Sequence, residues 1–271
     1  MITSLQNQRV KDIVKLGNAR ERRKQNLFLI EGASELSMAV SVGGYGIKTL
    51  FVCEALLSIE ARLLMMKWDI PFVKVSAEVF RKMAYRDESD GIIAVSKPKY
   101  LSLDKVRLSA NPFVVVLEAV EKPGNLGAIL RTADAARVDA VIVCDPKTDV
   151  YNPNIVRSSL GCVFTKQIVA CTSEEALQWL KQAGMRIFAA TLNASEHYYD
   201  TDFTQSTAVV MGSEAYGLTD FWMNNADGRI KIPMRGSIDS LNVSVSMAVL
   251  TFEAMRQRKF KERLAKVVEP D

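Results

Sequence analysis

Short apolar runs alternate with amphipathic segments along this chain, which is the pattern of an α/β protein. Near the N-terminus, the runs at 27–30, 47–53, 72–75 and 91–96 predict strands, and the segments between them predict helices. Residues 1–24 carry an apolar side between basic positions and predict an amphipathic helix. We therefore expect a small layered α/β domain at this end of the chain.

A second series of apolar runs begins at 113–117, a continuous Phe-Val-Val-Val-Leu segment that is typical of a strand buried on both faces. A helix is predicted from Asn125, because apolar residues follow it at helical spacing: Leu126, Ile129, Leu130 and Ala133. Further strands are predicted at 140–144, 167–170, 186–191, 207–211 and 229–232. This alternation indicates a largely parallel sheet of five or six strands, covered by helices.

A polar, irregular stretch from Lys97 to Pro112 separates the two series. Such a change of composition marks a linker between domains, and a chain of 271 residues has room for two. We therefore divide the chain into a domain at 1–98, a linker at 99–111 and a second domain at 112–271.

Two late apolar runs stop at residues that cannot easily continue a strand. Gly212 ends one run, and Pro233, which has no backbone N–H to donate, ends the next. A helix then begins near Ser240 or Asn242, and its apolar side is formed by Val243, Met247, Leu250 and Ala254. Because ligands gather at the carboxyl ends of parallel strands, these segments predict a pocket.

The charge of the chain permits nucleic-acid binding without demanding it. The chain has 48% apolar and 24% charged residues, with a net charge of +4. From residue 1 to 24 a single acid, Glu21, stands against seven bases: Arg9, Lys11, Lys15, Arg20, Arg22, Arg23 and Lys24. Such a cluster attracts a phosphate backbone, or is simply a solvated helix face.

Composition also excludes several classes of protein. The cysteines Cys53, Cys144, Cys162 and Cys171 lack C-x-x-C spacing and predict reduced thiols in a cytosolic protein. One histidine, His197, cannot supply a His/Cys zinc site, and it makes a Ser-His-Asp hydrolase difficult to build. No secretory leader is visible, and no apolar run approaches the length of about 18 residues that a membrane span needs. We expect a cytoplasmic protein without a metal.

Four separated blocks carry a resemblance to a known family. They are Lys-Pro-Gly-Asn-Leu-Gly-Ala-Ile-Leu-Arg-Thr-Ala at 122–133, Val-Met-Gly-Ser-Glu-Ala-Tyr-Gly-Leu at 210–218, Ile-Pro-Met-Arg-Gly at 232–236 and Ser-Leu-Asn-Val-Ser-Val at 240–245. In this order they resemble the motifs of the SpoU/TrmH family of S-adenosylmethionine-dependent RNA ribose 2′-O-methyltransferases, within the SPOUT superfamily.

This resemblance implies a particular fold and assembly. The C-terminal segment of the family threads through a loop to form a deep trefoil knot, and its members are homodimers. The N-terminal block, at 4–16 and 28–32, more weakly resembles the substrate-binding domain of SpoU-type enzymes, which has the fold of ribosomal protein L30e. The closing helix would supply the dimer contact through Met247, Leu250 and Met255, unless these residues belong to the core.

The resemblance also implies the site residues. Those expected to bind S-adenosylmethionine are Thr191, Leu192, Met211, Gly212, Ser213, Ile232, Pro233, Met234 and Leu241. Those expected at the catalytic centre are Arg131, Asn125, Glu214, Ser240 and Asn242, although capping of a helix explains the two asparagines and Ser240 equally well. Glu118 and Glu121 stand where relatives often carry aspartates, and no chemistry is expected of them.

In the family, the arginine that Arg131 matches is proposed to activate the ribose hydroxyl. A guanidinium has a pKa above about 12 and stays protonated in proteins. We therefore hypothesise that Arg131 holds the target phosphate and stabilises the developing alkoxide, with the proton passing to a phosphate oxygen or water.

Methylation of ribosomal RNA is the leading interpretation, because transfer-RNA relatives mostly lack a domain ahead of the catalytic one. A transfer-RNA 2′-O-methyltransferase and a catalytically silent RNA-binding protein of ribosome assembly are the alternatives. The intact catalytic set disfavours the silent protein. A nucleotide-using α/β enzyme is disfavoured because residues 161–166 lack the second glycine of a phosphate loop.

Overall fold

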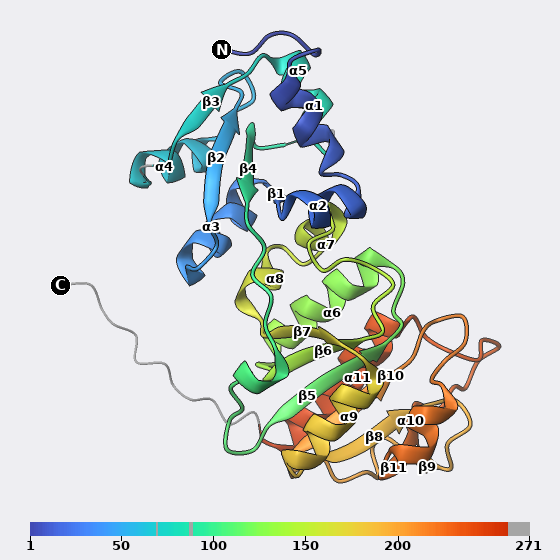
Figure 1. Cartoon of the computed structure of the whole chain (residues 1–271). Helices are drawn as coiled ribbons and strands as arrows, with labels where there is room; N and C mark the ends of the chain where they lie inside the picture. Colours follow the sequence, from blue (N-terminus) through green and yellow to red (C-terminus); the bar gives the residue numbers. More distant parts are fainter. Residues whose placement is uncertain (69, 87–88, 260–271) are drawn as a thin grey trace.

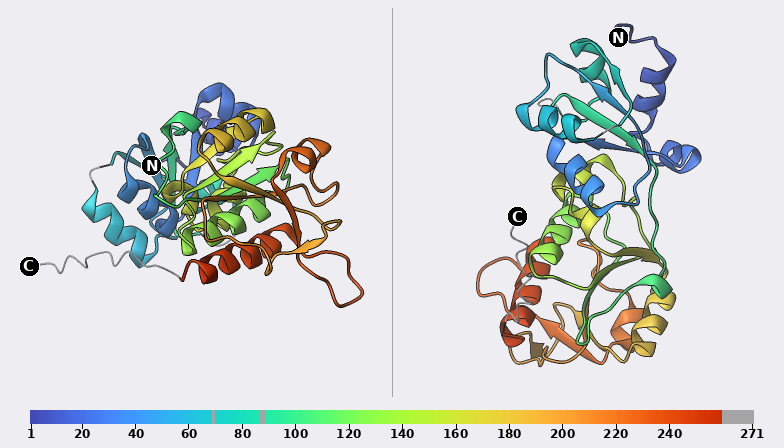
Figure 2. Two further views of the ribbon diagram at one scale, coloured as in Figure 1. Left: turned by 90° about the horizontal axis from the view of Figure 1, so that it is seen from below. Right: turned by 90° about the vertical axis from the view of Figure 1, so that its left-hand side faces the viewer.

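Two β-sheets lie at opposite ends of an elongated molecule (Figures 1 and 2). The computed structural model describes residues 1–68, 70–86 and 89–259, so the last twelve residues of the predicted second domain, 260–271, lie outside the described part. The N-terminal sheet has the order β1-β4-β2-β3, and β4 is antiparallel to both of its neighbours. Its strands are β1 (Phe28–Glu31), β2 (Ile47–Val52), β3 (Phe72–Lys74) and β4 (Ile92–Ser96).

The prediction of one helix over residues 1–24 is wrong, because two helices form there. α1 ends at Lys15, and the side chain of Asn18 accepts a hydrogen bond from the backbone N–H of Arg20 (2.8 Å), which caps a new helix. The helices of this part are α1 (Gln8–Lys15), α2 (Ala19–Gln25), α3 (Ala33–Val42), α4 (Ile59–Lys67) and α5 (Ala77–Met83).

The second sheet has seven strands in the order β7-β6-β5-β10-β8-β11-β9, and every neighbouring pair is parallel. The strands are β5 (Phe113–Glu118), β6 (Ala140–Cys144), β7 (Ile168–Cys171), β8 (Arg186–Ala190), β9 (Glu196–His197), β10 (Thr207–Met211) and β11 (Gly228–Lys231). The largely parallel α/β fold is confirmed. β9 adds a strand to the expected number, because a pair of polar residues leaves no apolar run to detect.

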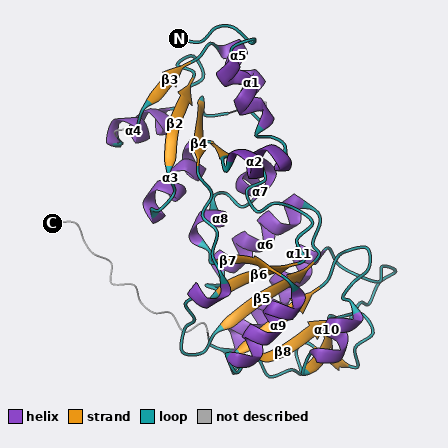
Figure 3. Ribbon diagram, in the orientation of Figure 1, coloured by secondary structure: helices purple, strands orange, loops and turns teal. Residues whose placement is uncertain are grey.

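Helices cover both faces of the second sheet (Figure 3). Alternate residues of its buried strands belong to two separate apolar clusters, one on each face. Val115 of β5 packs with α6 (Pro123–Ala135) and α11 (Val243–Gln257), whereas Val116 packs with α9 (Ser173–Gln182) and α10 (Asp220–Asn225). Met247 and Leu250 of α11 are completely buried, so they are core residues and cannot contact a second subunit. The trefoil knot stays a prediction.

The two sheets are joined by a shared apolar cluster. Phe28 of β1 packs against Tyr151, with ring centroids 4.3 Å apart, and against Phe164, at 6.1 Å. Tyr151 precedes α7 (Pro153–Ser158), and Phe164 lies in α8 (Cys162–Thr165). Among the residues described, no helix has the length and apolar character that would let it cross a membrane.

Arg22 ties the two parts together and is not a free base. It is only 4% exposed, its Nε lies 2.6 Å from Oδ2 of Asp149, and its Nη1 donates to the carbonyl oxygens of Leu16 (2.8 Å) and Gly17 (2.9 Å). Its inclusion in an RNA-facing cluster was therefore wrong. Sequence spacing could not show this, because the partner is 127 residues away.

We expect Arg22→Ala to destabilise the protein by about 3 kcal/mol, because removing one partner of a buried ion pair leaves the other charge uncompensated. Thermal unfolding followed by circular dichroism should show a midpoint lower by several degrees. Arg20→Ala is the matched control, since Arg20 is an exposed arginine of the same helix. Equal midpoints for the two variants would contradict a structural role for the ion pair.

Candidate active site

Three predicted loop positions meet at one edge of the second sheet. Thr191, Gly212 and Ile232 come directly after β8, β10 and β11. Ala190 is the register partner of both Met211 and Ile230, so the three strands end side by side. Strand termini leave backbone donors and acceptors unused, and a small polar molecule can bind to them.

The structure leaves no room for a side chain at Gly212. A Cβ there would lie 2.0 Å from the carbonyl carbon and oxygen of Gly217. The loop is closed on itself, because Ser213 N donates to Gly217 O (3.1 Å) and Gly217 N donates to Ser213 O (2.9 Å). This close return displays Glu214 and Tyr216 at the sheet edge, and Tyr216 is 88% exposed.

Asn125, Glu214 and Asn242 form one polar cluster, although 117 residues separate the two asparagines. Asn125 Nδ2 donates to Glu214 Oε1, and Asn242 Nδ2 lies 3.2 Å from both Asn125 Oδ1 and Glu214 Oε1. Lys122 adds an ion pair, with Nζ 2.9 Å from Glu214 Oε2. The cluster therefore links the N-terminal ends of α6 and α11 to the loop after β10. It holds donors and acceptors in fixed directions.

The two asparagines differ in their relation to the helices. Asn242 is the N-cap of α11 and accepts from Ser244 N (2.9 Å), as expected. Asn125 is not a cap, because α6 begins at Pro123, which suits the first helical position since it has no N–H to satisfy. The side chain of Asn125 is therefore fully available to the cluster.

Arg131 lies outside this cluster within a single chain. Six residues beyond Asn125 on α6, it is about 9 Å further along the axis and about 120° around the helix. It is exposed, and it shares a face with Asp134, which accepts from Thr165 Oγ1 (2.9 Å) and pairs with Lys166 Nζ (3.3 Å). Arg131 therefore faces the side of α6 that packs on α7 and α8.

The remaining predicted residues line the loops with different exposure. Met211 is buried, and Leu192 is 56% exposed. Ser240 is exposed and lies outside the polar cluster. The half-buried positions are Thr191, Gly212, Ser213, Ile232, Pro233, Met234 and Leu241.

Glu118, of which no chemistry is expected, has a structural role. It is 4% exposed at the end of β5, and its carboxylate accepts from Thr219 N (2.8 Å) and Thr219 Oγ1 (2.7 Å). This anchors the end of the loop that carries Glu214 to the central strand. A carboxylate directly after a fully buried apolar run is the one signal that could have indicated a satisfied structural anchor.

Two family patterns match the chain. Residues 112–252 match the SpoU rRNA Methylase family, and residues 7–94 match the MRM3-like substrate binding domain.

Similar proteins cover nearly the whole chain. The 23S rRNA (guanosine(2553)-2′-O)-methyltransferase RlmP of Bacillus subtilis is 31% identical over 93% of this chain and 97% of its own length. A 23S rRNA (uridine(2479)-2′-O)-methyltransferase of Streptomyces viridochromogenes is 31% identical over 90% of this chain and 87% of that protein. Among solved structures, the SpoU methyltransferase AviRb of Streptomyces viridochromogenes, in complex with the cofactor AdoMet, has a TM-score of 0.86 and 30% identity, covering 94% of this chain and 99% of AviRb.

Proposed function

The chain belongs to the SpoU rRNA methylase family of RNA ribose 2′-O-methyltransferases, and we propose that it methylates ribosomal RNA with the residues gathered at the carboxyl edge of its second sheet. The cofactor is S-adenosylmethionine, which supplies a methyl group activated by its sulfonium. The observation that carries the assignment of the site is the polar cluster of Asn125, Glu214 and Asn242 beside three strand ends.

The half-buried loops fit the cofactor. The backbone around Thr191, Gly212 and Ile232 offers N–H and C=O groups that match the hydrogen-bonding edge of an adenine. Leu241 and Met234 provide apolar surface, and Glu214 provides a carboxylate near a cationic ligand. No charged group is needed for the adenine, because neutral backbone groups read it.

In the catalytic step, these residues position the ribose and stabilise the developing negative charge. Asn125 and Asn242 offer fixed amide groups that orient the ribose, while Arg131 binds the adjacent phosphate and stabilises negative charge on the attacking 2′-oxygen. When bound, S-adenosylmethionine would supply the methyl group to the 2′-oxygen and keep the electron pair of its carbon–sulfur bond, while the hydroxyl proton would pass to a phosphate oxygen or water. Arg131 stays protonated throughout.

A homodimer would bring Arg131 to the site of a second subunit, because within one chain it lies on a different face of α6 from Asn125. Val245 on α11 is 48% exposed and Ile238 in the preceding loop is 62% exposed, and both supply apolar surface for such a contact. The N-terminal block, 1–98, would then hold the RNA. We infer from the proposed ribosomal substrate that the protein acts in the cytoplasm.

We expect calorimetry to show that the protein binds S-adenosylmethionine, because the loops and Gly212 are arranged to receive it. An absence of binding would support the silent RNA-binding alternative. Mapping of ribose methylation across total RNA, from cells with and without the protein, should show one lost modification in ribosomal RNA. A modification lost only from transfer RNA would support the other alternative.

A further inference from the structure

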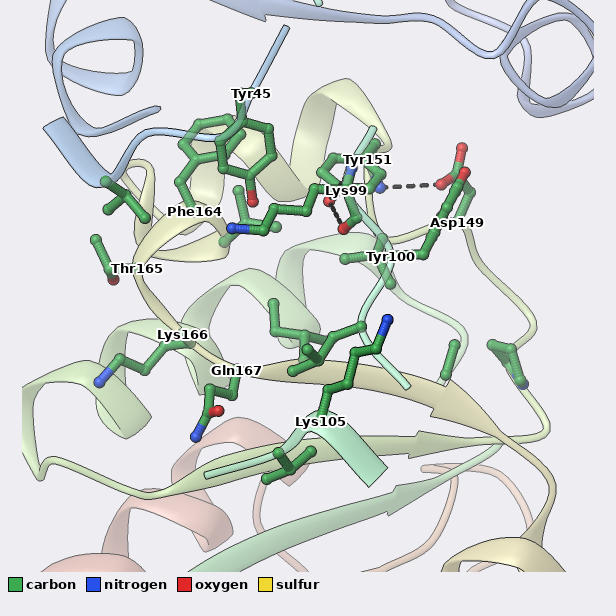
Figure 4. A pocket seen from close by; sticks show the side chains of 18 of the residues that line it. Tyr45, Lys99, Tyr100, Lys105, Asp149, Tyr151, Phe164, Thr165, Lys166 and Gln167 are labelled. Atoms are coloured by element: carbon green, nitrogen blue, oxygen red, sulfur yellow. Dashed lines mark hydrogen bonds between the residues drawn. The ribbon is translucent and has the colours of Figure 1, made fainter. Parts of the chain in front are cut away.

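A cavity of about 1000 Å³ lies between the two parts of the molecule (Figure 4), and no residue of the polar cluster or of the cofactor loops lines it. Its walls come from the linker, the loop after β6, α8 and the start of β7. Two carboxylates line it, and Asp149 is already paired with Arg22. The lining bases outnumber them: Arg23, Lys99, Lys105, Arg107, Lys147 and Lys166. The cavity is therefore suited to an anion.

Tyr100 presents an aromatic ring to this cavity. The residue is 67% exposed, and its ring forms a T-shaped pair with that of Tyr151 at a centroid distance of 5.8 Å. Tyr151 is buried, its hydroxyl donates to the carbonyl oxygen of Lys99, and it accepts from Lys99 N (3.1 Å). Burial raises the pKa of Tyr151, which keeps this donor protonated. The backbone beside Tyr100 is thus held in place.

Lys99 and Lys105 also line the cavity. Lys99 Nζ lies 5.9 Å from the ring centroid of Tyr45, and Lys105 extends from the 3-10 turn η1 (Leu103–Lys105) towards the same cavity (Figure 4). Gln167 holds the linker from below, since its side chain accepts from Arg107 N (2.9 Å) and donates to Arg107 O (2.7 Å). An aromatic ring with lysines nearby matches a base with its phosphates.

The cavity is connected to the face of α6 that carries Arg131. Lys166 lines the cavity and pairs with Asp134, three residues beyond Arg131 on the same helical face. An RNA strand whose target ribose lies at Arg131 can therefore place a nearby nucleotide in the cavity. A paired base could not present its face to Tyr100, because its neighbours in the duplex cover it.

We propose that this cavity binds an unpaired nucleotide of the RNA substrate, near the methylated one in the strand, with its base stacked on Tyr100 and its phosphates contacting Lys99 and Lys105. This inference rests on the proposed function for the identity of the ligand. The volume agrees with sites for molecules of nucleotide size, which span about 300–1000 Å³.

Binding of a short fluorescein-labelled single-stranded RNA to the full chain, measured by anisotropy, tests the proposal. Tyr100→Ala should weaken binding by about 10-fold or more, whereas Tyr100→Phe should stay within about 2-fold of the unaltered protein, because stacking needs the ring and not the hydroxyl. Lys105→Gln should reduce the salt dependence of log K by about 0.7. Tyr199→Ala is the control, because this exposed tyrosine follows β9, at the opposite edge of the sheet from β7.

Two results would overturn the proposal. One is equal affinity of Tyr100→Ala and the unaltered protein for the single strand. The other is a loss of affinity in Tyr100→Ala that is the same for single-stranded and for duplex RNA. Such a loss would indicate that the substitution perturbs the RNA-binding surface in general. Calorimetry of the Tyr100→Ala variant with S-adenosylmethionine should give unchanged affinity and show that the variant is folded. Failure of the unaltered protein to bind this cofactor would refute the proposed function. The RNA measurement would still show whether the cavity binds an unpaired nucleotide.

Discussion

Arg131→Lys is expected to lower kcat for ribose methylation by about 100-fold or more, with unchanged affinity for S-adenosylmethionine. Lysine keeps the charge but loses the planar pair of donors that can hold a phosphate and a developing alkoxide together. Single-turnover transfer of a radioactive methyl group to ribosomal RNA measures the effect. Arg256→Lys is the matched control, because it also removes the two guanidinium donors of a bidentate pair, with Glu253, but near the far end of α11 from the candidate active site.

Near-normal turnover of Arg131→Lys would contradict the fixed clamp. A simple point charge would then suffice, and the alkoxide would need stabilisation from another group. A loss of cofactor affinity in the same variant would also contradict the assignment, because Arg131 lies outside the cofactor loops of its own chain.

Gly212→Ala should abolish measurable binding of S-adenosylmethionine, with a loss of about 100-fold or more, and leave the fold intact. The added Cβ would meet backbone atoms of Gly217 at 2.0 Å, so the loop at 213–217 must move away from the strand ends. Calorimetry measures the affinity, and circular dichroism measures the fold. Gly124→Ala is the control, because a Cβ there meets no atom within 4 Å. Cofactor binding by Gly212→Ala at normal strength would place the cofactor elsewhere.

The same two variants test whether each active site contains residues from two subunits. If the protein forms the proposed homodimer, co-expression of Arg131→Lys and Gly212→Ala with different tags gives mixed dimers. If Arg131 serves the cofactor of the partner, each mixed dimer keeps one complete site, and about a quarter of the normal activity should return in a random mixture. If Arg131 serves its own chain, the mixture should stay inactive.

Six of the strands of the second sheet, and the helices α6 and α11, could be predicted from the sequence, because buried parallel strands are continuous apolar runs and core helices repeat every three to four residues. The strand ends at Gly212 and Ile232 were visible because Gly212 and Pro233 cannot easily continue a strand. The family and its cofactor followed from four ordered blocks, and those predictions are confirmed.

Local patterns determined which segments are helices or strands, because hydrophobic periodicity, caps and prolines act over a few residues of chain. Contacts over long separations were decided only by the tertiary structure. Arg22 looked like a surface base until Asp149 was placed beside it, and Glu118 looked inert until Thr219 was seen to donate to it. The cavity at Tyr100 likewise depends on how the linker lies across two domains, and no local pattern in the sequence carries that information.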